Sequence, residues 1–401
     1  MFCYQATLRR LFDLRPLPKF GLERMQILMG DLAHPQNNYS VFHVAGTNGK
    51  GSTCAFLESI LRAAGYKTGL YTSPHLTCAR ERIQINRELI SEEDFVRLEQ
   101  QVGLDATFFE RMTAMALLYF SEQKVDVAII EVGLGGRLDA TNIVTPVVCG
   151  ISRIDLDHQD ILGDSLEKIA FEKAGIMKPG VPVCWSAQDP VVEAVLRRHC
   201  ECSEAIHEPW IAASAAPPRN DELGLAGPHQ VANAALAVNM ILASGFSVSE
   251  SAIQIGLKNA HWPCRYELIG ENILLDGAHN PAGTQALIKT IQEDSRFQGR
   301  DLTLWVGMTE GHGGEEIARL WADFVPNAQV FVGRSKSLRA LPIEVVSKYF
   351  QDAGFNPKLS LGLCPSKHAV RRRVVTGSLY WAGEVRSRLL SMPVDGASTY
   401  Y

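Results

Sequence analysis

The residues whose types and spacing most clearly suit a chemical function form a short glycine-rich loop. It follows the β-branched run Ser40–Ala45 and precedes a stretch of helical spacing that starts at Cys54. A glycine-rich turn between a strand and a helix points backbone N–H groups and the positive end of the helix dipole at one small region, which suits a polyphosphate. We expect Lys50 to reach the β- and γ-phosphates. The predicted phosphate-binding residues are Gly46, Thr47, Asn48, Gly49, Lys50, Gly51 and Ser52.

The loop departs from the standard phosphate-loop pattern, G-x-x-x-x-G-K-[ST], in two places. Val44 occupies the first glycine position and Gly51 the hydroxyl position, whereas Gly46 and Ser52 supply these features two places and one place later. We therefore interpret the segment as a variant phosphate loop. The alternative interpretation is a tight strand-to-helix turn that carries a surface lysine.

Two further candidate residues follow predicted strands. Glu131 stands near the end of the apolar run Val125–Val132, and His158 follows the run Val147–Ile151. Ligands of open parallel sheets bind outside the carboxyl ends of the strands, so Glu131 is a candidate Mg²⁺ ligand beside the phosphate loop. The alternative for Glu131 is a structural carboxylate paired with Arg137. A lone histidine is usually only a polar loop residue. His158 is a candidate ligand because it also follows the carboxyl end of a predicted strand.

Lys173 is a charged residue that is expected to lie on the buried face of a helix. Asp164 can cap a helix with Glu167 in the capping-box position, and Gly175 can end that helix. At about 100° per residue, Lys173 falls in the middle of the apolar stripe of this helix. An isolated buried ammonium is costly or loses its proton. From spacing alone, snorkelling of the amine to solvent is the favoured explanation, and a functional site is the second.

The elements that must position these residues alternate along nearly the whole chain. Short β-branched runs and helix-period stretches follow one another, which predicts an α/β fold with parallel sheets flanked by helices. Residues 203–227 lose this periodicity and are predicted to form a surface connection. The predicted domains are residues 1–267, which carry the glycine-rich loop, and residues 268–401, a smaller α/β domain. Further strands are expected at Val181–Trp185, Ile273–Leu275, Leu302–Val306, Gln329–Val332 and Val374–Thr376.

Size and charge limit the classes of function. The chain has 401 residues, more than one hydrophobic core comfortably holds, and 46% of them are hydrophobic. A net charge of −5 gives no general electrostatic reason to bind nucleic acid or an anionic membrane. No apolar window reaches the length of a membrane crossing, so a soluble cytoplasmic protein is expected. The nine cysteines lack a C-x-x-C pair and are interpreted as reduced thiols, not zinc ligands.

Six stretches, taken in order, resemble the Mur ligase superfamily, and specifically its bacterial folylpolyglutamate synthase/dihydrofolate synthase branch. The resemblance implies a phosphate-loop ATPase domain followed by a Rossmann-like domain. Cys264 stands where the family has glycine, and Asn86-Arg87 replaces the usual Asn-Gly. The stretches are Gly46–Ser52, Thr72–Leu76 with Glu81–Ile83, Glu131–Asn142, Leu156–Ile176, Gly227–Ala234 and Leu275–Pro281.

The resemblance also implies roles for individual residues. The metal positions are expected to hold two Mg²⁺ ions, and Lys173 matches a lysine that is carbamoylated in the family, where CO₂ turns a cation into an anion. The implied metal-binding residues are Ser73, Glu131, His158 and Lys173. The implied nucleotide-contacting residues beyond the loop are Asn233, Arg265, Asp276 and His279. The implied catalytic residues are Lys50, His158, Lys173, Asp276 and His279. The candidate substrate residues are Arg82 and Asp139.

The implied activity is ATP-dependent amide ligation. Phosphorylation of a carboxylate gives it a good leaving group, and the amine of L-glutamate then displaces phosphate. The implied partners are small molecules, namely ATP, L-glutamate and dihydropteroate or a folate, acting on a monomeric enzyme. Two other interpretations stay open at this point: a P-loop kinase, and a nucleotide-binding module without catalysis. If the chain is a ligase, the acid could also be a cell-wall precursor, but Gly133–Asn142 resembles the folate branch.

Overall fold

The computed structural model describes residues 3–13, 21–103, 106–203, 206–207, 219–298, 301–360, 371–392 and 394–395. The chain forms two compact units. Unit one comprises Met1–His75, Ala79–Gly224 and Gln230–His261, and unit two comprises Leu76–Cys78, Leu225–His229 and Trp262–Tyr401. The division at His261 precedes the boundary predicted after residue 267. The reason is that Tyr266 N donates a hydrogen bond to Asp276 in unit two.

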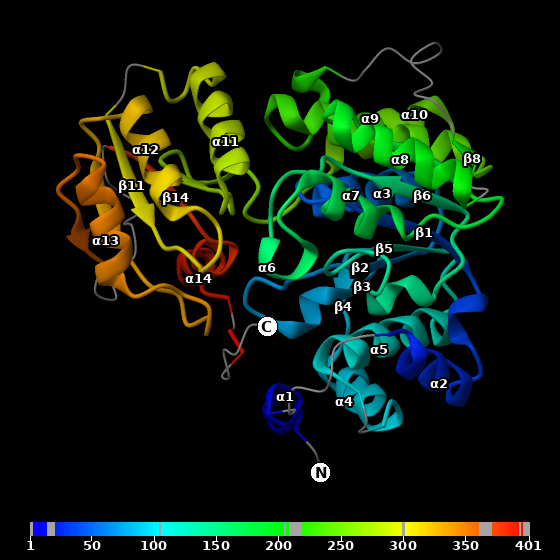
Figure 1. The fold of residues 1–401 in the computed structure, drawn as a ribbon. Helices are drawn as coiled ribbons and strands as arrows, with labels where there is room; N and C mark the ends of the chain where they lie inside the picture. The colour runs from blue at the N-terminus through cyan, green and yellow to red at the C-terminus, as the bar shows by residue number, and fades with distance from the viewer. Residues whose placement is uncertain are drawn as a thin grey trace. The chain divides into compact units, whose positions relative to one another are not determined.

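Unit one is built on an eight-stranded sheet in the order β4-β3-β2-β5-β1-β6-β7-β8. Figure 1 shows β6, β1, β5, β2, β3 and β4 lying one beside the next. Every neighbouring pair is parallel except β2–β3 and β3–β4. The strands are β1 Ser40–Ala45, β2 Thr68–Tyr71, β3 Ile83–Ile85, β4 Glu88–Leu89, β5 Val127–Glu131, β6 Val148–Ile151, β7 Pro182–Trp185 and β8 Ile206–His207.

Helices cover both faces of this sheet. The chain passes from β1 to β2 in one direction along the sheet and from β5 to β6 in the other, and right-handed crossovers in opposite directions place helices on opposite faces. The face with Cys149 and Ile151 packs against α7 and α8, whereas Gly150 on the other face lies against Met240 of α9. The α-helices of this part of the chain are α1 Tyr4–Phe12, α2 Glu23–Asp31, α3 Lys50–Ala63, α4 Glu92–Gln101, α5 Phe108–Glu122, α6 Gln159–Leu162, α7 Leu166–Ala174, α8 Pro190–Cys202, α9 Pro228–Ala243 and α10 Glu250–Asn259. Short 3₁₀ turns are η1 Pro35–Asn37, η2 Ala79–Arg82, η3 Ala140–Ile143 and η4 Asn220–Glu222.

Unit two carries a six-stranded sheet in the order β13-β12-β11-β14-β10-β9, parallel except for β9. One core packs α11, α12 and α13 against one face, and a second core packs α14 against the other. The strands are β9 Glu267–Ile269, β10 Ile273–Leu275, β11 Leu302–Val306, β12 Gln329–Val332, β13 Lys358–Leu359 and β14 Arg372–Thr376. The helices are α11 Pro281–Glu293, α12 Gly314–Phe324, α13 Ile343–Asp352 and α14 Leu379–Leu390.

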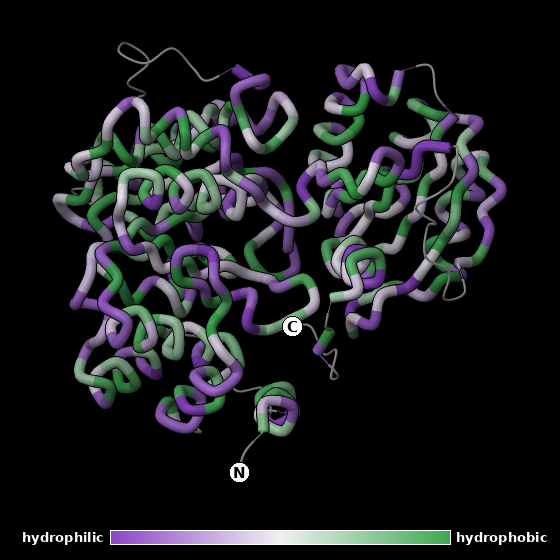
Figure 2. The backbone as a smooth tube through the Cα atoms, turned by 180° about the vertical axis from the view of Figure 1, so that it is seen from behind, coloured by the Kyte–Doolittle hydropathy of each residue, from purple (hydrophilic) through white to green (hydrophobic). Residues whose placement is uncertain are grey.

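Figure 2 shows hydrophobic and hydrophilic residues alternating along the chain in both units. Within the described residues, no helix has both the length and the apolar character to cross a membrane. The predicted surface connection 203–227 contains the edge strand β8 and the turn η4, and residues 208–218 of it lie outside the described residues. Its β8 segment pairs with β7, so that part is sheet and not an irregular connection.

Candidate active site

The phosphate loop joins the central strand β1 to α3. Gly46 and Gly49 adopt φ values of +140° and +96°, which residues with a side chain rarely adopt. The segment that follows β6 forms hydrogen bonds with the loop. Thr47 Oγ1 donates to Asp155 O at 3.1 Å, and Asn48 Nδ2 donates to Asp155 Oδ2 at 2.9 Å. Gly51 and Ser52 lie in the first turn of α3, where backbone N–H groups have no intrahelical acceptor and suit an anion.

Two lysine amines converge on one carbonyl of this loop. Lys50 Nζ donates to Gly46 O and Thr47 O, both at 3.1 Å. Lys173 Nζ donates to the same Gly46 O at 2.8 Å, although the two residues are 127 positions apart in the chain. The arrangement places two lysine amines beside the loop where the sequence predicts phosphate.

Lys173 lies on the inward face of α7, as the helical spacing predicts, and only 4% of it is exposed. Burial, and secondarily the charge of Lys50, lowers the pKa of its ammonium to about 7. The favoured explanation of snorkelling is wrong, because the amine ends at a buried backbone carbonyl. The predicted cap is also wrong: Ser165 caps α7 and accepts from Lys168 N, whereas Asp164 pairs with Lys168 Nζ.

Glu131 and Ser73 lie together at the carboxyl ends of neighbouring strands. Glu131 ends β5 beside Val44 of β1, and Ser73 follows β2. Ser73 N donates to Glu131 Oε2 at 3.0 Å, so the main chain orients this buried carboxylate. Arg137, the alternative partner of Glu131, forms an ion pair with Glu172 at 2.8 Å.

His158 follows β6, the other neighbour of β1, and precedes α6. Its backbone is left-handed, with φ +49°, and its N–H donates to Asp157 Oδ1 at 2.9 Å. The imidazole Nε2 lies 4.0 Å from Asp157 Oδ2. The strand order therefore brings the segments of Ser73, Glu131, the phosphate loop and His158 to one edge of the sheet.

Asn233 comes to this edge from α9. A Cβ on Gly49 would lie 2.2 Å from Asn233 Oδ1, so the asparagine amide packs directly on the loop backbone. Asn233 Nδ2 donates to Gln230 Oε1 at 3.0 Å, which fixes the orientation of the amide.

The two candidate substrate residues are both buried in unit one. Arg82 Nε donates to His75 Nδ1 at 2.9 Å, and its guanidinium lies over the Phe108 ring at 5.2 Å. Asp139 accepts from the main chain of Leu134 and from Thr141. Burial raises the pKa of the Asp139 carboxyl.

The three candidate residues of unit two also lie together. Asp276 follows β10 and accepts from Tyr266 N and Ala278 N, both at 2.8 Å. Burial raises the pKa of Asp276, against the opposing effect of the Arg265 guanidinium. His279 Nδ1 is 2.9 Å from Gly277 O, and its ring packs edge-on against His312 with centroids 5.0 Å apart.

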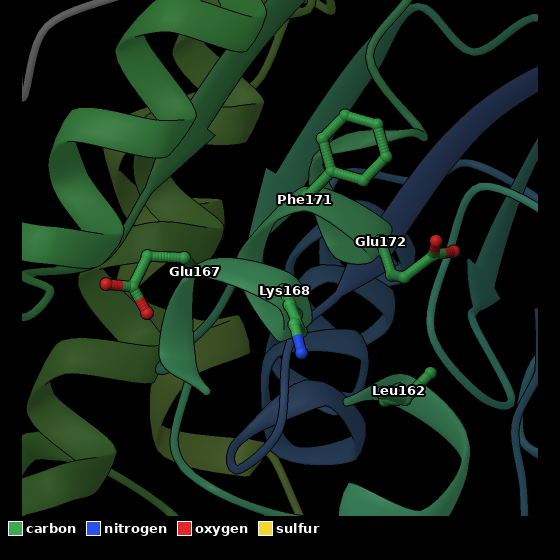
Figure 3. A pocket seen from close by; sticks show the side chains of 5 residues that line it. All are labelled: Leu162, Glu167, Lys168, Phe171 and Glu172. Atoms are coloured by element: carbon green, nitrogen blue, oxygen red, sulfur yellow. The ribbon is translucent and has the colours of Figure 1, made fainter. Parts of the chain in front are cut away.

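A surface pocket of about 400 Å³ lies over α6 and α7 and contains none of the candidate residues. Figure 3 shows its lining side chains, including Glu167 and Lys168 on the outward side of α7. Sequence reasoning missed Asp155, which accepts hydrogen bonds from the side chains of Thr47 and Asn48 in the loop. Its signal was its place between β6 and His158, next to the strand that precedes the loop.

A variant phosphate loop, a carboxylate at the end of the adjoining strand and a second α/β unit define a Mur ligase type of protein, and residues 44–201 match the model of the Mur ligase middle domain. The dihydrofolate synthase/folylpolyglutamate synthase of Bacillus subtilis is 36% identical over 95% of this chain and 96% of its own length. The folylpolyglutamate synthase of Lacticaseibacillus casei is 32% identical over 96% of this chain and 99% of its own. The chain belongs to the folylpolyglutamate synthase/dihydrofolate synthase family.

Solved structures agree with this assignment. The folylpolyglutamate synthase of Thermotoga maritima has a TM-score of 0.82 and 33% identity, covering 98% of this chain and 97% of that one. Escherichia coli FolC in complex with DHPP and ADP has a TM-score of 0.85 and 28% identity, covering 97% and 98%. The family and the fold class predicted from the sequence are confirmed.

Proposed function

We propose that this chain is an ATP-dependent ligase that joins the amine of L-glutamate to dihydropteroate, to a folate, or to both, and releases ADP and phosphate. The observation that carries the proposal is the pair of amines from Lys50 and Lys173 on Gly46 O. Phosphoryl transfer needs fixed positive charge around the phosphates, which Lys50 supplies, and the buried Lys173 amine beside it is open to carbamoylation. A kinase would use the first lysine but has no need of the second, buried one. Membership of the family supports the same choice.

The donor chemistry at the end of β5 fits Mg²⁺. The carboxylate of Glu131 and the hydroxyl of Ser73 are oxygen donors, the class that this ion prefers. We assign Mg²⁺ to these two residues, with His158 as the third ligand that the resemblance implies. When bound, Mg²⁺ neutralises charge on the phosphates.

Lys173 is suited to carbamoylation, which we propose as its working state. With a pKa of about 7, a large fraction of its amine is unprotonated at physiological pH. The Nζ lone pair forms an N–C bond to CO₂, and one N–H proton leaves to water. The carbamate removes one positive charge beside Gly46 and adds two oxygen acceptors, which can serve a second Mg²⁺.

The reaction then follows in two displacements. A carboxylate oxygen of the acid attacks the γ-phosphorus while the bond from that phosphorus to ADP breaks, and Lys50 with the loop amides stabilises the transferred charge. The glutamate amine next attacks the acyl carbon, and the carbon–oxygen bond to phosphate breaks. We assign Asn233, Arg265, Asp276 and His279 to the nucleotide, Asp276 and His279 also to catalysis, and Arg82 and Asp139 to the substrate.

Release of ADP and phosphate from the purified protein tests the proposal. The protein is incubated with ATP and Mg²⁺ and with dihydropteroate, a reduced folate or a cell-wall precursor acid, each with and without L-glutamate. We expect ADP and a product one glutamate heavier by mass only when a pterin acid and glutamate are both present. A stable phosphorylated hydroxyl product would establish a kinase, and ATP binding without ADP a non-catalytic module.

The sequence further predicts a cytoplasmic monomer that binds small molecules and no nucleic acid, and we retain these as proposals. Light scattering of the purified chain tests the oligomeric state. A mass near 44.1 kDa is expected.

A further inference from the structure

His43 is a buried titratable residue that the proposed reaction does not use. It lies in β1, three residues before Gly46, and its side chain is fully buried. Burial, and secondarily Lys178, lowers the pKa of His43 to about 3, so the ring is neutral and carries one N–H. Its Nε2 lies 2.9 Å from Thr141 Oγ1. Within the described part of the chain, His43 Nδ1 has no hydrogen-bond partner.

Thr141 fixes the direction of these hydrogen bonds. Its hydroxyl lies 2.5 Å from Asp139 Oδ1, and Asp139 also accepts from Thr141 N at 3.0 Å and Leu134 N at 2.9 Å. The Thr141 hydroxyl donates to Asp139 Oδ1, so its oxygen is left to accept from His43 Nε2–H. Three buried side chains therefore connect β1 to the loop of residues 133–142.

This loop contacts both sides of the proposed metal site. On one side it begins directly after Val132, whose N–H donates to Val44 O at 2.9 Å and which follows Glu131. On the other side Arg137 N donates to Glu172 O at 2.8 Å, and Asn142 Nδ2 donates to Gly175 O at 3.0 Å. Glu172 and Gly175 flank Lys173 in the chain, so a displaced loop would disturb Glu131 and Lys173 together.

We propose that His43 and Thr141 are positioning residues, whose hydrogen bonds to Asp139 set the loop 133–142 and thereby the placement of Glu131 and Lys173 beside the phosphate loop. This proposal rests on the proposed ligase function. An apolar side chain would fill the space of His43 without the desolvation cost of a buried polar group. The buried hydrogen bonds from His43 to Thr141 and from Thr141 to Asp139 restrict the motion of the loop in return.

Four substitutions separate the hydrogen bonds from the space that the side chains fill. Thr141→Val removes the hydroxyl at nearly constant shape, and Thr141→Ser keeps it. His43→Gln places its amide nitrogen near the position of Nε2, whereas His43→Asn places it near Nδ1 and cannot reach Thr141. We call the hydrogen bonds from His43 to Thr141 and from Thr141 to Asp139 the relay. Thr141→Val and His43→Asn break the relay, whereas Thr141→Ser and His43→Gln keep it.

Hydrogen exchange of the nucleotide-free full chain gives a readout that does not depend on activity. In Thr141→Val and His43→Asn, exchange of a peptide spanning 132–142 should rise about tenfold, the factor for one buried hydrogen bond. Thr141→Ser and His43→Gln should match the wild type, and a peptide spanning 302–306 in unit two should not change. An unchanged Thr141→Val peptide, or an equal rise in both peptides, would overturn the proposal.

The Mg²⁺ dependence of ADP release gives the second readout. The broken variants should need about tenfold more Mg²⁺ for half-maximal rate, with the KM for glutamate unchanged. A wild-type protein that releases no ADP with a pterin acid and glutamate contradicts the proposed function, and the exchange experiment still tests the relay. An active wild type with an unaffected Thr141→Val contradicts the relay alone.

Discussion

The phosphate loop of unit one and the bend before β9 in unit two both contain left-handed backbone, but they use different residue types for it. The loop places glycine at 46 and 49, whereas the bend has Cys264 and Tyr266 at φ +54° and +48°. Left-handed backbone costs a residue with a side chain ~1 kcal/mol. The bend bears this cost and keeps its conformation through the hydrogen bond from Tyr266 N to Asp276.

Close approach explains why the loop cannot do the same. A Cβ would lie 2.0 Å from Ser152 Oγ at Gly46 and 2.2 Å from Asn233 Oδ1 at Gly49. The loop therefore needs glycine for space as well as for conformation, and the bend needs only the conformation. Substitutions at the two regions should differ in effect accordingly.

Gly49→Ala should have the largest effect. The methyl group would displace Asn233 from the loop, and displacements of about 1 Å in a catalytic site can cost 100-fold in rate. We expect kcat/KM for ATP to fall about 100-fold in steady-state ADP release. Gly245→Ala is the matched control, because Gly245 has φ +77° and an added Cβ there would meet nothing within 4 Å. Equal losses in both variants would mean that conformation alone decides the loop.

Lys173→Met probes the buried amine beside the phosphate loop. Between pH 7 and 10.5 the unfolded lysine keeps a proton that the folded one has released, so the free energy of unfolding of the wild type rises with pH in that window. From about pH 7.5 to about pH 9, in CO₂-free buffer, the wild type should gain about 2 kcal/mol over Lys173→Met. Urea unfolding at both pH values measures the difference. Parallel pH profiles of the two proteins would contradict it.

Arg87→Gly tests a second site where this chain lacks the family's glycine. Arg87 has φ +72°, donates to His261 O at 2.9 Å and lies 3.9 Å from the buried carboxylate of Glu58. Glycine relieves the backbone, but it removes these contacts from a buried charge. We expect a net loss of about 1 kcal/mol in the free energy of unfolding. A more stable variant would show that the contacts contribute little.

Cys264→Gly should have the smallest effect. The gain from relaxed backbone is offset by the loss of a fully buried thiol, so the free energy of unfolding should stay within about 1 kcal/mol of the wild type. Urea unfolding followed by the fluorescence of the buried Trp305, Trp321 and Trp381 measures unit two. A loss as severe as that of Gly49→Ala would show that the bend also requires space.

The sequence predicted the central strands because continuous β-branched runs mark strands buried on both faces. Ser40–Ala45, Ile273–Leu275, Leu302–Val306 and Gln329–Val332 agree with β1, β10, β11 and β12 residue by residue. The strands β2, β3, β4, β8, β9 and β13 were missed, since two to four residues with mixed polarity carry no periodic signal. The cap of α7 was misplaced because Asp164 and Ser165 are adjacent and both can cap.

At the candidate site, too, the sequence predicted features set by neighbouring residues but not contacts between residues far apart in the chain. The inward direction of Lys173 follows from helical spacing, but its acceptor Gly46 lies 127 residues earlier. The hydrogen bond between His43 and Thr141 spans 98 residues, so no local pattern indicates it. The roles assigned to individual residues at the site stay predictions.

The Gly46 carbonyl, shared by Lys50 and Lys173, has a thermodynamic consequence. A carbamate on Lys173 would remove the hydrogen bond from Lys173 Nζ to that carbonyl and change the electrostatic potential at the phosphate loop. Coupling between two ligands is reciprocal, so any factor by which bicarbonate alters the affinity for nucleotide is the factor by which nucleotide alters the retention of CO₂. Dissolved carbon dioxide would then act as an effector of ATP affinity.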